Sequence, residues 1–347
     1  MDVFSYDLPD EKIAQRPVHP YDSAKLLVLS KNVTRIQESE FSNFHDFVTP
    51  LDLIVFNNTK VIPARFRGSF EAGGGAAEVL ILQEMNPHEW WALGKPLKKF
   101  KVGATLNFDD HLQARVLERE GTEKVLLKFT ASSPIQEDVK ARMGECGMMP
   151  IPPYIRKGAG DAADRIDYQT FFAEKEGSIA APTASLHFTK NLVSKIQKKG
   201  TAISHLTLHV GAASFLPLWH EHESEIRKPG VEFFQFDPGI LKLCEEAKAR
   251  GGRVIAVGTT VVRALESHAL VGQSVAVGSW LPTELFITPG FKFQLVDGIV
   301  TNFHQPRTTH LLLVESFLGR DPLEAAYQYA LENDFRFLSY GDGMFIS

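Results

Sequence analysis

The chain has 347 residues, of which 44% are hydrophobic and 23% charged, and its formal net charge is −5 at pH 7. This is the profile of an ordinary globular protein with room for two domains. The small negative charge excludes a general affinity for polyanions, so a nucleic-acid partner would need a local basic patch. We find no run of about 18 uncharged apolar residues and no basic leader, and we therefore expect a cytoplasmic protein without a membrane segment.

The cysteine and histidine content argues against a metal centre. Cys146 and Cys244 are the two cysteines and stand far apart, which excludes a disulfide framework and a cysteine metal site. A histidine and glutamate run at 220–223 suggests metal ligands, but no third ligand follows at a recognisable spacing. We therefore expect no bound metal and interpret the run as a solvated acidic loop.

The N-terminal region predicts a short helix over 8–15, with Pro9 at its start, and strands over 25–30 and 52–56. Short polar residues follow the second of these strands at 57–60. Such residues at the carboxyl end of a buried strand often bind ligands in α/β proteins. The alternative is an ordinary turn that uses asparagines.

Between about residues 67 and 129 the pattern changes to short strands with turn residues between them. The expected strands are 78–83, 90–93, 104–108, 114–119 and 124–129. This pattern predicts a small antiparallel barrel or sandwich. Because helices and buried strands alternate again after about residue 150, we expect an α/β domain of residues 1–66 and 150–347, interrupted by an inserted β-barrel domain of residues 67–149.

The inserted segment contains the most basic stretch of the chain, soon after Trp90 and Trp91. Its four lysines are Lys95, Lys98, Lys99 and Lys101. Positive charge beside aromatic rings is typical of RNA contact, so these lysines are candidate RNA-binding residues. A lysine-rich edge strand that prevents aggregation is an equal alternative.

Three later segments place small and hydroxyl-bearing residues just before a helix, at 177–189, 256–260 and 301–309. Small residues let a ligand approach the backbone, and the free N–H groups of a helix start can bind an electron-rich group. We expect the three segments to be walls of one pocket.

Further elements of the second half follow from periodicity and turn residues. We expect helices over 190–199, 242–249, 261–269, 309–318 and 321–331, and strands over 206–210 and 253–257. The Asp297-Gly298 pair predicts a hairpin of 293–296 and 299–301, and the tail at 335–342 is expected as a strand and turn. His209 faces away from the apolar side of its strand, where a structural role is the alternative to a catalytic one.

Together, these stretches resemble the S-adenosylmethionine:tRNA ribosyltransferase-isomerases of queuosine biosynthesis. The matching stretches are 56–65, 167–170, 180–189, 207–211, 252–267, 301–309 and 340–342. They cover nearly the whole chain in order. The resemblance implies a barrel-like α/β domain interrupted by a small antiparallel β-barrel, and a monomeric enzyme.

The resemblance also implies a reaction. S-adenosylmethionine is consumed as ribosyl donor, and the 7-aminomethyl-7-deazaguanine of tRNA becomes epoxyqueuosine while adenine and methionine leave. No permanently bound cofactor or metal is implied. The reaction needs a base beside the sulfonium and an acid for adenine, and histidines have suitable pKa values. His187, His209 and His304 are the candidate catalytic residues.

Other residues of the matching stretches are candidates for holding hydroxyls, base edges, the methionine carboxylate or a phosphate. They are Asn57, Thr59, Arg65, Asp167, Tyr168, Gln169, Thr183, Ser185, Thr259, Thr260, Arg263, Asn302 and Arg307. Arg263 could instead pair with Glu266, three residues further along its helix.

One segment, 213–232, departs from the family pattern and keeps only Glu232. This departure leaves two alternatives: an enzyme of the same fold that acts on another nucleoside or acceptor, and a tRNA-binding protein without catalysis. The stretches expected to meet the donor, 180–188 and 258–260, keep the pattern. We therefore expect donor binding even if the acceptor differs.

Overall fold

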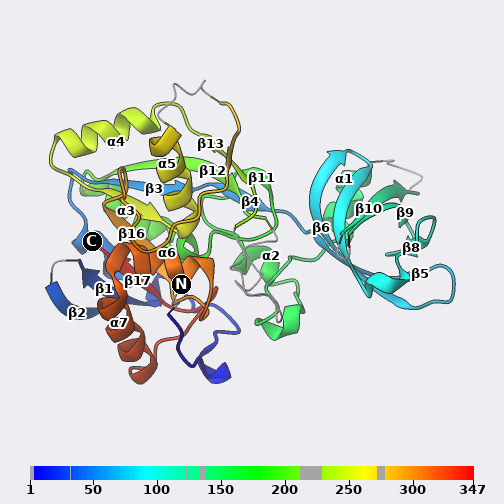
Figure 1. Cartoon of the computed structure of the whole chain (residues 1–347), viewed down its shortest axis with the longest axis horizontal. Helices are drawn as coiled ribbons and strands as arrows, with labels where there is room; N and C mark the ends of the chain where they lie inside the picture. Colours follow the sequence, from blue (N-terminus) through cyan, green and yellow to red (C-terminus); the bar gives the residue numbers. More distant parts are fainter. Residues whose placement is uncertain (1–3, 32, 122–123, 133–137, 212–228, 272–277) are drawn as a thin grey trace. The chain divides into compact units, whose positions relative to one another are not determined.

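The structure is a computed structural model, and it describes residues 4–31, 33–121, 124–132, 138–211, 229–271 and 278–347 (Figure 1). The chain forms two compact units. The larger contains Met1–Lys60, Tyr154–Lys157 and Asp167–Ser347, and the smaller contains Val61–Pro153 and Gly158–Ile166. These limits lie a few residues from the expected division at 66/67 and 149/150, and the stretch Gly158–Ile166 belongs with the smaller unit.

A nine-stranded sheet forms the centre of the larger unit (Figure 1). From edge to edge its order is β15 (Leu281–Thr283), β13 (Glu232–Phe236), β12 (Ala202–His209), β3 (Leu53–Asn57), β14 (Val254–Val257), β16 (Gly298–Asn302), β17 (Gly343–Ile346), β1 (Lys25–Ser30) and β2 (Val33–Glu40). The four neighbours β12, β3, β14 and β16 are parallel to one another. Their carboxyl ends therefore meet at one edge of the sheet, where α/β proteins bind ligands.

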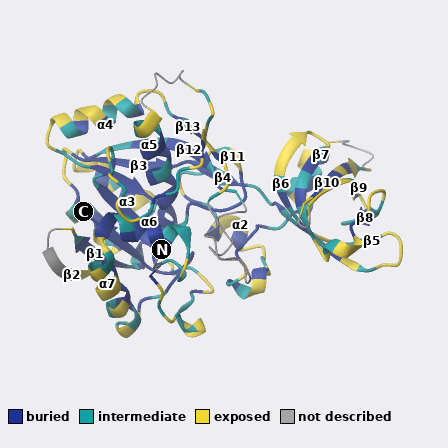
Figure 2. Ribbon diagram, viewed as in Figure 1, coloured by how far each residue is buried: buried dark blue, intermediate teal, exposed yellow. Residues whose placement is uncertain are grey.

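The central strands are buried on both faces, as the dark blue sheet in Figure 2 shows. In β3, Leu53 and Val55 pack into one apolar cluster, while Ile54 and Phe56 pack into another. Since successive side chains of a strand point to opposite faces, a strand between two cores needs an unbroken apolar run. This accounts for the continuous apolar sequence that predicts the strand.

Helices cover the sheet (Figure 1). They are α3 (Lys190–Lys198), α4 (Ile240–Ala249), α5 (Thr259–Val271), α6 (Thr309–Leu318) and α7 (Arg320–Glu332). The hydroxyl of Thr189 accepts a hydrogen bond from the N–H of Leu192 at 3.2 Å, which caps α3. Among the described residues, no helix is both long and apolar enough to span a membrane.

The expected hairpin over 293–301 is wrong. Only its second half is a strand, β16, which pairs with β14 and β17. The backbone N–H groups of Gln294, Leu295 and Val296 donate instead to the carboxylate of Glu266, at 2.8–3.0 Å. Because one buried side chain takes the hydrogen bonds that a strand partner would take, this segment stays outside the sheet.

Two other expectations near the ends of the chain need correction. The helix expected over 8–15 is only a 3-10 turn, Asp10–Lys12. The tail at 335–342 forms turns, and the strand follows it as β17. There the carboxylate of Asp342 accepts the N–H groups of Lys25 and Arg336, at 2.9 and 2.7 Å, and so fixes the turn beside β1.

The smaller unit contains a closed antiparallel barrel with the order β10, β7, β6, β5, β8 and β9. These strands are β5 (Arg65–Phe70), β6 (Ala76–Asn86), β7 (Glu89–Lys95), β8 (Thr105–Asn107), β9 (Leu112–Glu120) and β10 (Lys124–Ala131). The helices α1 (Val139–Cys146) and α2 (Asp164–Asp167) follow the barrel, and β4 (Thr59–Val61) pairs with β11 (Lys175–Ser178). The expected mixed α/β fold with an inserted antiparallel β-barrel is thus confirmed.

Candidate active site

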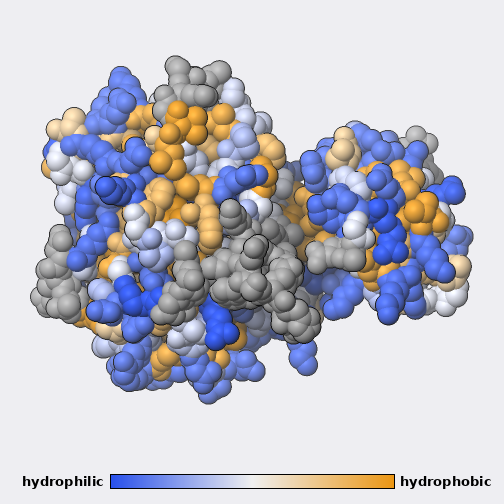
Figure 3. All heavy atoms as spheres, viewed as in Figure 1, coloured by the Kyte–Doolittle hydropathy of each residue, from blue (hydrophilic) through white to orange (hydrophobic). Residues whose placement is uncertain are grey.

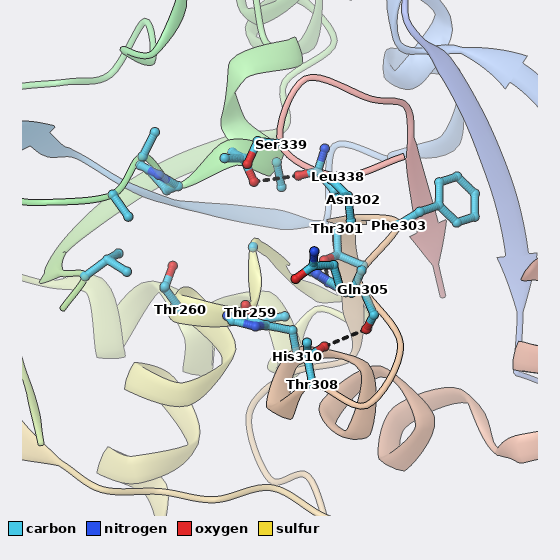
Figure 4. A pocket seen from close by; sticks show the side chains of 18 of the residues that line it. Thr259, Thr260, Thr301, Asn302, Phe303, Gln305, Thr308, His310, Leu338 and Ser339 are labelled. Atoms are coloured by element: carbon cyan, nitrogen blue, oxygen red, sulfur yellow. Dashed lines mark hydrogen bonds between the residues drawn. The ribbon is translucent and has the colours of Figure 1, made fainter. Parts of the chain in front are cut away.

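One pocket of the larger unit is lined by all three of the small-residue segments (Figure 4). They contribute residues 180–184, 258–260 and 301–305, and Val210 adds the end of β12. The expectation that these segments form the walls of one pocket is confirmed. The empty space, its open mouth included, is about 800 Å³.

A helix start forms one wall of this pocket. Gly258 has φ +96°, a left-handed conformation that favours glycine, and its N–H donates to the carbonyl of Val300 at 2.8 Å. The chain then turns into α5, so that Thr259 and Thr260 bring their hydroxyls and the N-terminal end of the helix to the pocket (Figure 4). Such an end carries free N–H groups and a partial positive charge.

Asn302 connects the pocket to a buried histidine. The hydroxyl of Thr183 donates to its side-chain oxygen at 2.8 Å, and its amide nitrogen lies 3.2 Å from Nε2 of His187. His187 stacks on Phe41, with ring centroids 4.1 Å apart, and is not among the residues that line this pocket. Burial, with a smaller contribution from Arg336, lowers its pKa from 6.5 to about 3. A neutral His187 can therefore orient the side chain of Asn302 through this contact, from outside the pocket.

His304 is the one expected catalytic histidine that lines the pocket. Its Nε2 lies 2.7 Å from the hydroxyl of Thr301. Two tyrosines hold its backbone, because the hydroxyl of Tyr6 donates to its carbonyl and its N–H donates to the hydroxyl of Tyr327. Burial first, and then the neighbouring His310, hold the pKa of His304 well below 6.5, so the ring is neutral at pH 7.

His310 is a lining residue that the sequence reasoning missed. It stands in the first turn of α6, and its ring stacks on that of His304, with centroids 5.3 Å apart and planes at 22°. Burial, followed by the charge of Arg263, lowers its pKa to about 4. The available signal was a second histidine just inside the helix that Thr308 caps, one residue beyond the matching stretch.

His209 lies outside the lining, at the end of β12. Its Nδ1 lies 2.8 Å from the hydroxyl of Thr59, and its ring stacks on Trp280 with centroids 4.8 Å apart. Burial, and then Lys175, lower its pKa to about 4. Gly177, with φ +142°, passes so close that a Cβ there would come within 2.7 Å of Nε2. The structure therefore places His209 in a tight aromatic environment and not in the pocket.

The expected substrate-binding residues divide into two groups. Those that line the pocket are Tyr168, Thr183, Thr259, Thr260 and Asn302. The lining also includes Tyr154, Gln305 and Ser339, which sequence reasoning did not single out, and the hydroxyls of Tyr154 and Ser339 lie 2.7 Å apart. Among the described residues, no Asp, Glu, Lys or Arg lines the pocket, so its polarity comes from hydroxyls, amides and imidazoles.

The other candidates in the larger unit do not line the pocket, although the side-chain amide of Asn57 donates to the hydroxyl of the lining residue Thr260 at 3.5 Å. The side-chain oxygen of Asn57 accepts the N–H groups of Thr59 and Leu208, at 3.1 and 3.0 Å. Asp167 accepts from the hydroxyl of Tyr21 at 2.8 Å. Ser185 is buried, and Gln169 is half-buried.

The expected arginines do not line the pocket either. Arg263 pairs with Glu232 and donates from Nε to the carbonyl of Leu285 at 3.0 Å, so it does not pair with Glu266. Arg307 is exposed, in a left-handed conformation with φ 57°. Arg65 belongs to the smaller unit, where it pairs with Glu78 at 2.8 Å.

The run at 220–223 and most of the divergent segment 213–232 lie outside the described residues. Within the described ranges, no three His, Cys, Asp or Glu side chains come together to hold a metal ion. Glu232, the family residue that this segment keeps, accepts the N–H of Gly211 at 3.1 Å.

The comparison with known families decides the family of this chain. The profile described as queuosine biosynthesis protein matches residues 1–346. The chain belongs to this family. It is 40% identical over 348 residues to the S-adenosylmethionine:tRNA ribosyltransferase-isomerase of Halothermothrix orenii, covering 100% of this chain and 99% of that protein.

Other relatives of the queuosine biosynthesis family agree. The protein of the same name from Rhizobium rhizogenes is 40% identical over 356 residues, covering 99% of this chain and 98% of its own. The crystal structure of the S-adenosylmethionine tRNA ribosyltransferase from Thermotoga maritima matches with a TM-score of 0.54 and 34% identity, covering 99% of both chains. The resemblance inferred from the sequence is therefore confirmed.

Proposed function

We propose that this chain catalyses the reaction that its relatives' names state, transferring and isomerising the ribosyl part of S-adenosylmethionine onto tRNA. The observation that carries this proposal is the meeting of three family-matching segments at one pocket, at the carboxyl ends of parallel strands. The acceptor would be the 7-aminomethyl-7-deazaguanine of tRNA, and the product epoxyqueuosine. A monomeric state and a cytoplasmic location stay predictions.

The neutral lining fits a cationic donor. A sulfonium ion would meet hydroxyls, amides and uncharged imidazoles, with no lysine or arginine among the described lining residues to repel it. The methionine carboxylate would be received by the N-terminal end of α5, where Thr259 and Thr260 lie. This assignment replaces the arginines that the sequence suggested for the carboxylate.

We assign proton transfer to His304. The carbon beside a sulfonium is acidified, and a neutral imidazole with a free ring nitrogen can take its proton. Nε2 of His304 is held by Thr301, and no hydrogen bond joins its other ring nitrogen to a described residue. Thr183 and Asn302 would orient the ribose hydroxyls, and His187 holds the side-chain amide of Asn302 from outside the pocket.

The test is release of adenine from S-adenosylmethionine, with and without tRNA that carries the deazaguanine precursor. We expect adenine only when that tRNA is present. Release without the tRNA would favour an enzyme of the same fold with another acceptor. No release, despite tRNA binding, would favour a tRNA-binding protein without catalysis.

Four lysines of the smaller unit, Lys95, Lys98, Lys99 and Lys101, are our candidates for contact with the tRNA backbone. All four are exposed, and no ion pair joins any of them to a described carboxylate. Lys95 ends β7, which has strand partners on both sides in the closed barrel, so the need to protect an open edge does not explain it. Figure 3 shows hydrophilic residues (blue) around the barrel on the face in view, with hydrophobic ones (orange) between them.

Changing Lys95, Lys98, Lys99 and Lys101 to Ser should weaken tRNA binding and flatten its salt dependence. Each lost phosphate contact should remove roughly 0.7–0.9 from the slope of log affinity against log salt. Lys124→Ser is the matched control, because Lys124 is an exposed barrel lysine that pairs with Glu120 at 3.5 Å. An unchanged slope in the fourfold variant would place the RNA contact elsewhere.

A further inference from the structure

The two histidines that line the pocket, His304 and His310, form a stacked pair, and the turn that connects them contains an unfavourable backbone conformation. His304 follows β16 and His310 lies in the first turn of α6, and between them Arg307 adopts a left-handed conformation with φ 57°. A residue other than glycine is disfavoured there by roughly 1 kcal/mol or more. The turn brings the two rings into a stack with planes at 22°.

The ring nitrogens of His310 have no hydrogen-bond partner among the described residues, although the ring lines the pocket. The other buried or half-buried histidines of this region differ. Nε2 of His187 is occupied by Asn302, and Nδ1 of His209 by Thr59. A neutral imidazole that lines a substrate pocket and has no hydrogen-bond partner among the described residues can accept a proton at its unprotonated nitrogen.

We propose that His310 is a second catalytic residue, which carries a proton from the attacking amine of the acceptor to the departing adenine. This inference rests on the proposed function. As the nitrogen lone pair of the amine forms a bond to the ribose carbon that carries adenine, a proton leaves that nitrogen for a ring nitrogen of His310. As the bond between ribose and adenine breaks, its electron pair goes to adenine, and His310 gives the same proton to an adenine nitrogen. His310 is neutral before and after.

Two features of the pair suit this role. A half-buried imidazole with a pKa of about 4 holds a proton weakly, so once protonated it is a strong acid toward a weakly basic nucleobase. In addition, when His304 has taken the proton from the donor carbon, its positive charge lies 5.3 Å from the ring of His310. Repulsion between like charges opposes a lasting charge on His310, so a proton taken from the amine passes on to adenine.

The test compares His310→Gln, His310→Phe and His310→Ala in adenine release by the full chain with donor and precursor tRNA. We expect each variant to release adenine about 10²-fold more slowly, with KM for the donor changed by less than about threefold. Added imidazole should restore a large part of the rate in His310→Ala only, because the free base can occupy the vacated space. Donor binding by calorimetry should be unchanged.

His268→Gln is the control, since His268 lies on α5 against Phe236 and outside the pocket lining. Full activity of His310→Phe would overturn the proposal, because it would show that the ring only stacks. Failure of imidazole to rescue folded His310→Ala would also overturn it. If the unaltered chain releases no adenine, the proposed function itself fails, which keeps the two outcomes distinct.

Discussion

Replacing His304 by Gln should lower turnover by about 10²–10⁴-fold while leaving thermal unfolding nearly unchanged. The ring lines the pocket and faces His310, and its fixed contact is with the hydroxyl of Thr301, which a Gln side chain can partly replace. The loss should appear in kcat, because the proton is transferred only in the transition state. Steady-state adenine release and a melting curve of the same preparation measure both quantities.

The matched control is His209→Gln. His209 is held by Thr59 and Trp280 outside the pocket lining, so its replacement should cost stability and change turnover by less than about tenfold. The opposite pattern, with normal turnover in His304→Gln and a large loss in His209→Gln, would move the reaction away from this pocket.

The pH dependence follows from the lowered pKa of His304. Burial disfavours the charged ring, so the neutral base is already present at pH 7 and is lost only as the pH falls through that lowered value. We therefore expect turnover by the unaltered enzyme to show no histidine-like rise between about pH 6 and 8. A rise centred on 6.5 would assign the base to an exposed histidine.

Glu266→Ala should destabilise the larger unit by about 3–6 kcal/mol. The fully buried carboxylate accepts three consecutive backbone N–H groups, those of residues 294–296, and alanine would leave them without an acceptor. Each unsatisfied buried N–H costs about 1–3 kcal/mol, and partial relaxation reduces the sum. Urea unfolding followed by a probe in the larger unit gives the change in free energy.

Glu245→Ala provides the control, because Glu245 is exposed on α4 and should change stability by less than about 0.5 kcal/mol. Glu266→Gln keeps one acceptor oxygen and should fall between the two. Equal stability of Glu266→Ala and Glu245→Ala would mean that water satisfies the three N–H groups, and our account of the missing hairpin would then fail.

The sequence predicts elements well where local pattern and burial agree. The strand at 25–30 lies where it was expected, and helix α6 occupies 309–318 as predicted, because an apolar run or a capped amphipathic stretch fixes each locally. The pocket was predictable for a related reason: small residues between a buried strand and a helix start mark the carboxyl edge of a parallel sheet, and 256–260 does so.

The remainder depends on contacts between distant parts of the chain. The carboxylate of Glu266 replaces a strand partner for 294–296, and no local pattern reports that contact. Similarly, sequence cannot distinguish His187, which supports Asn302 from the buried side, from His304, which faces the pocket. Both residues are histidines, and both lie in stretches that match the family. Only the fold determines which of the two rings lines the pocket.

The order of strands in the large sheet has a consequence for synthesis of the chain on the ribosome. β1 lies between β2 and β17, and β17 is made after every other strand of that sheet. Strands β1 to β3 emerge before the barrel, whose last strand ends at Ala131, long before their later partners exist. The barrel can therefore close first, while the apolar edge of β1 waits for residues 343–346 and is open to pairing with other chains. We expect aggregation of nascent chains to concentrate in this interval.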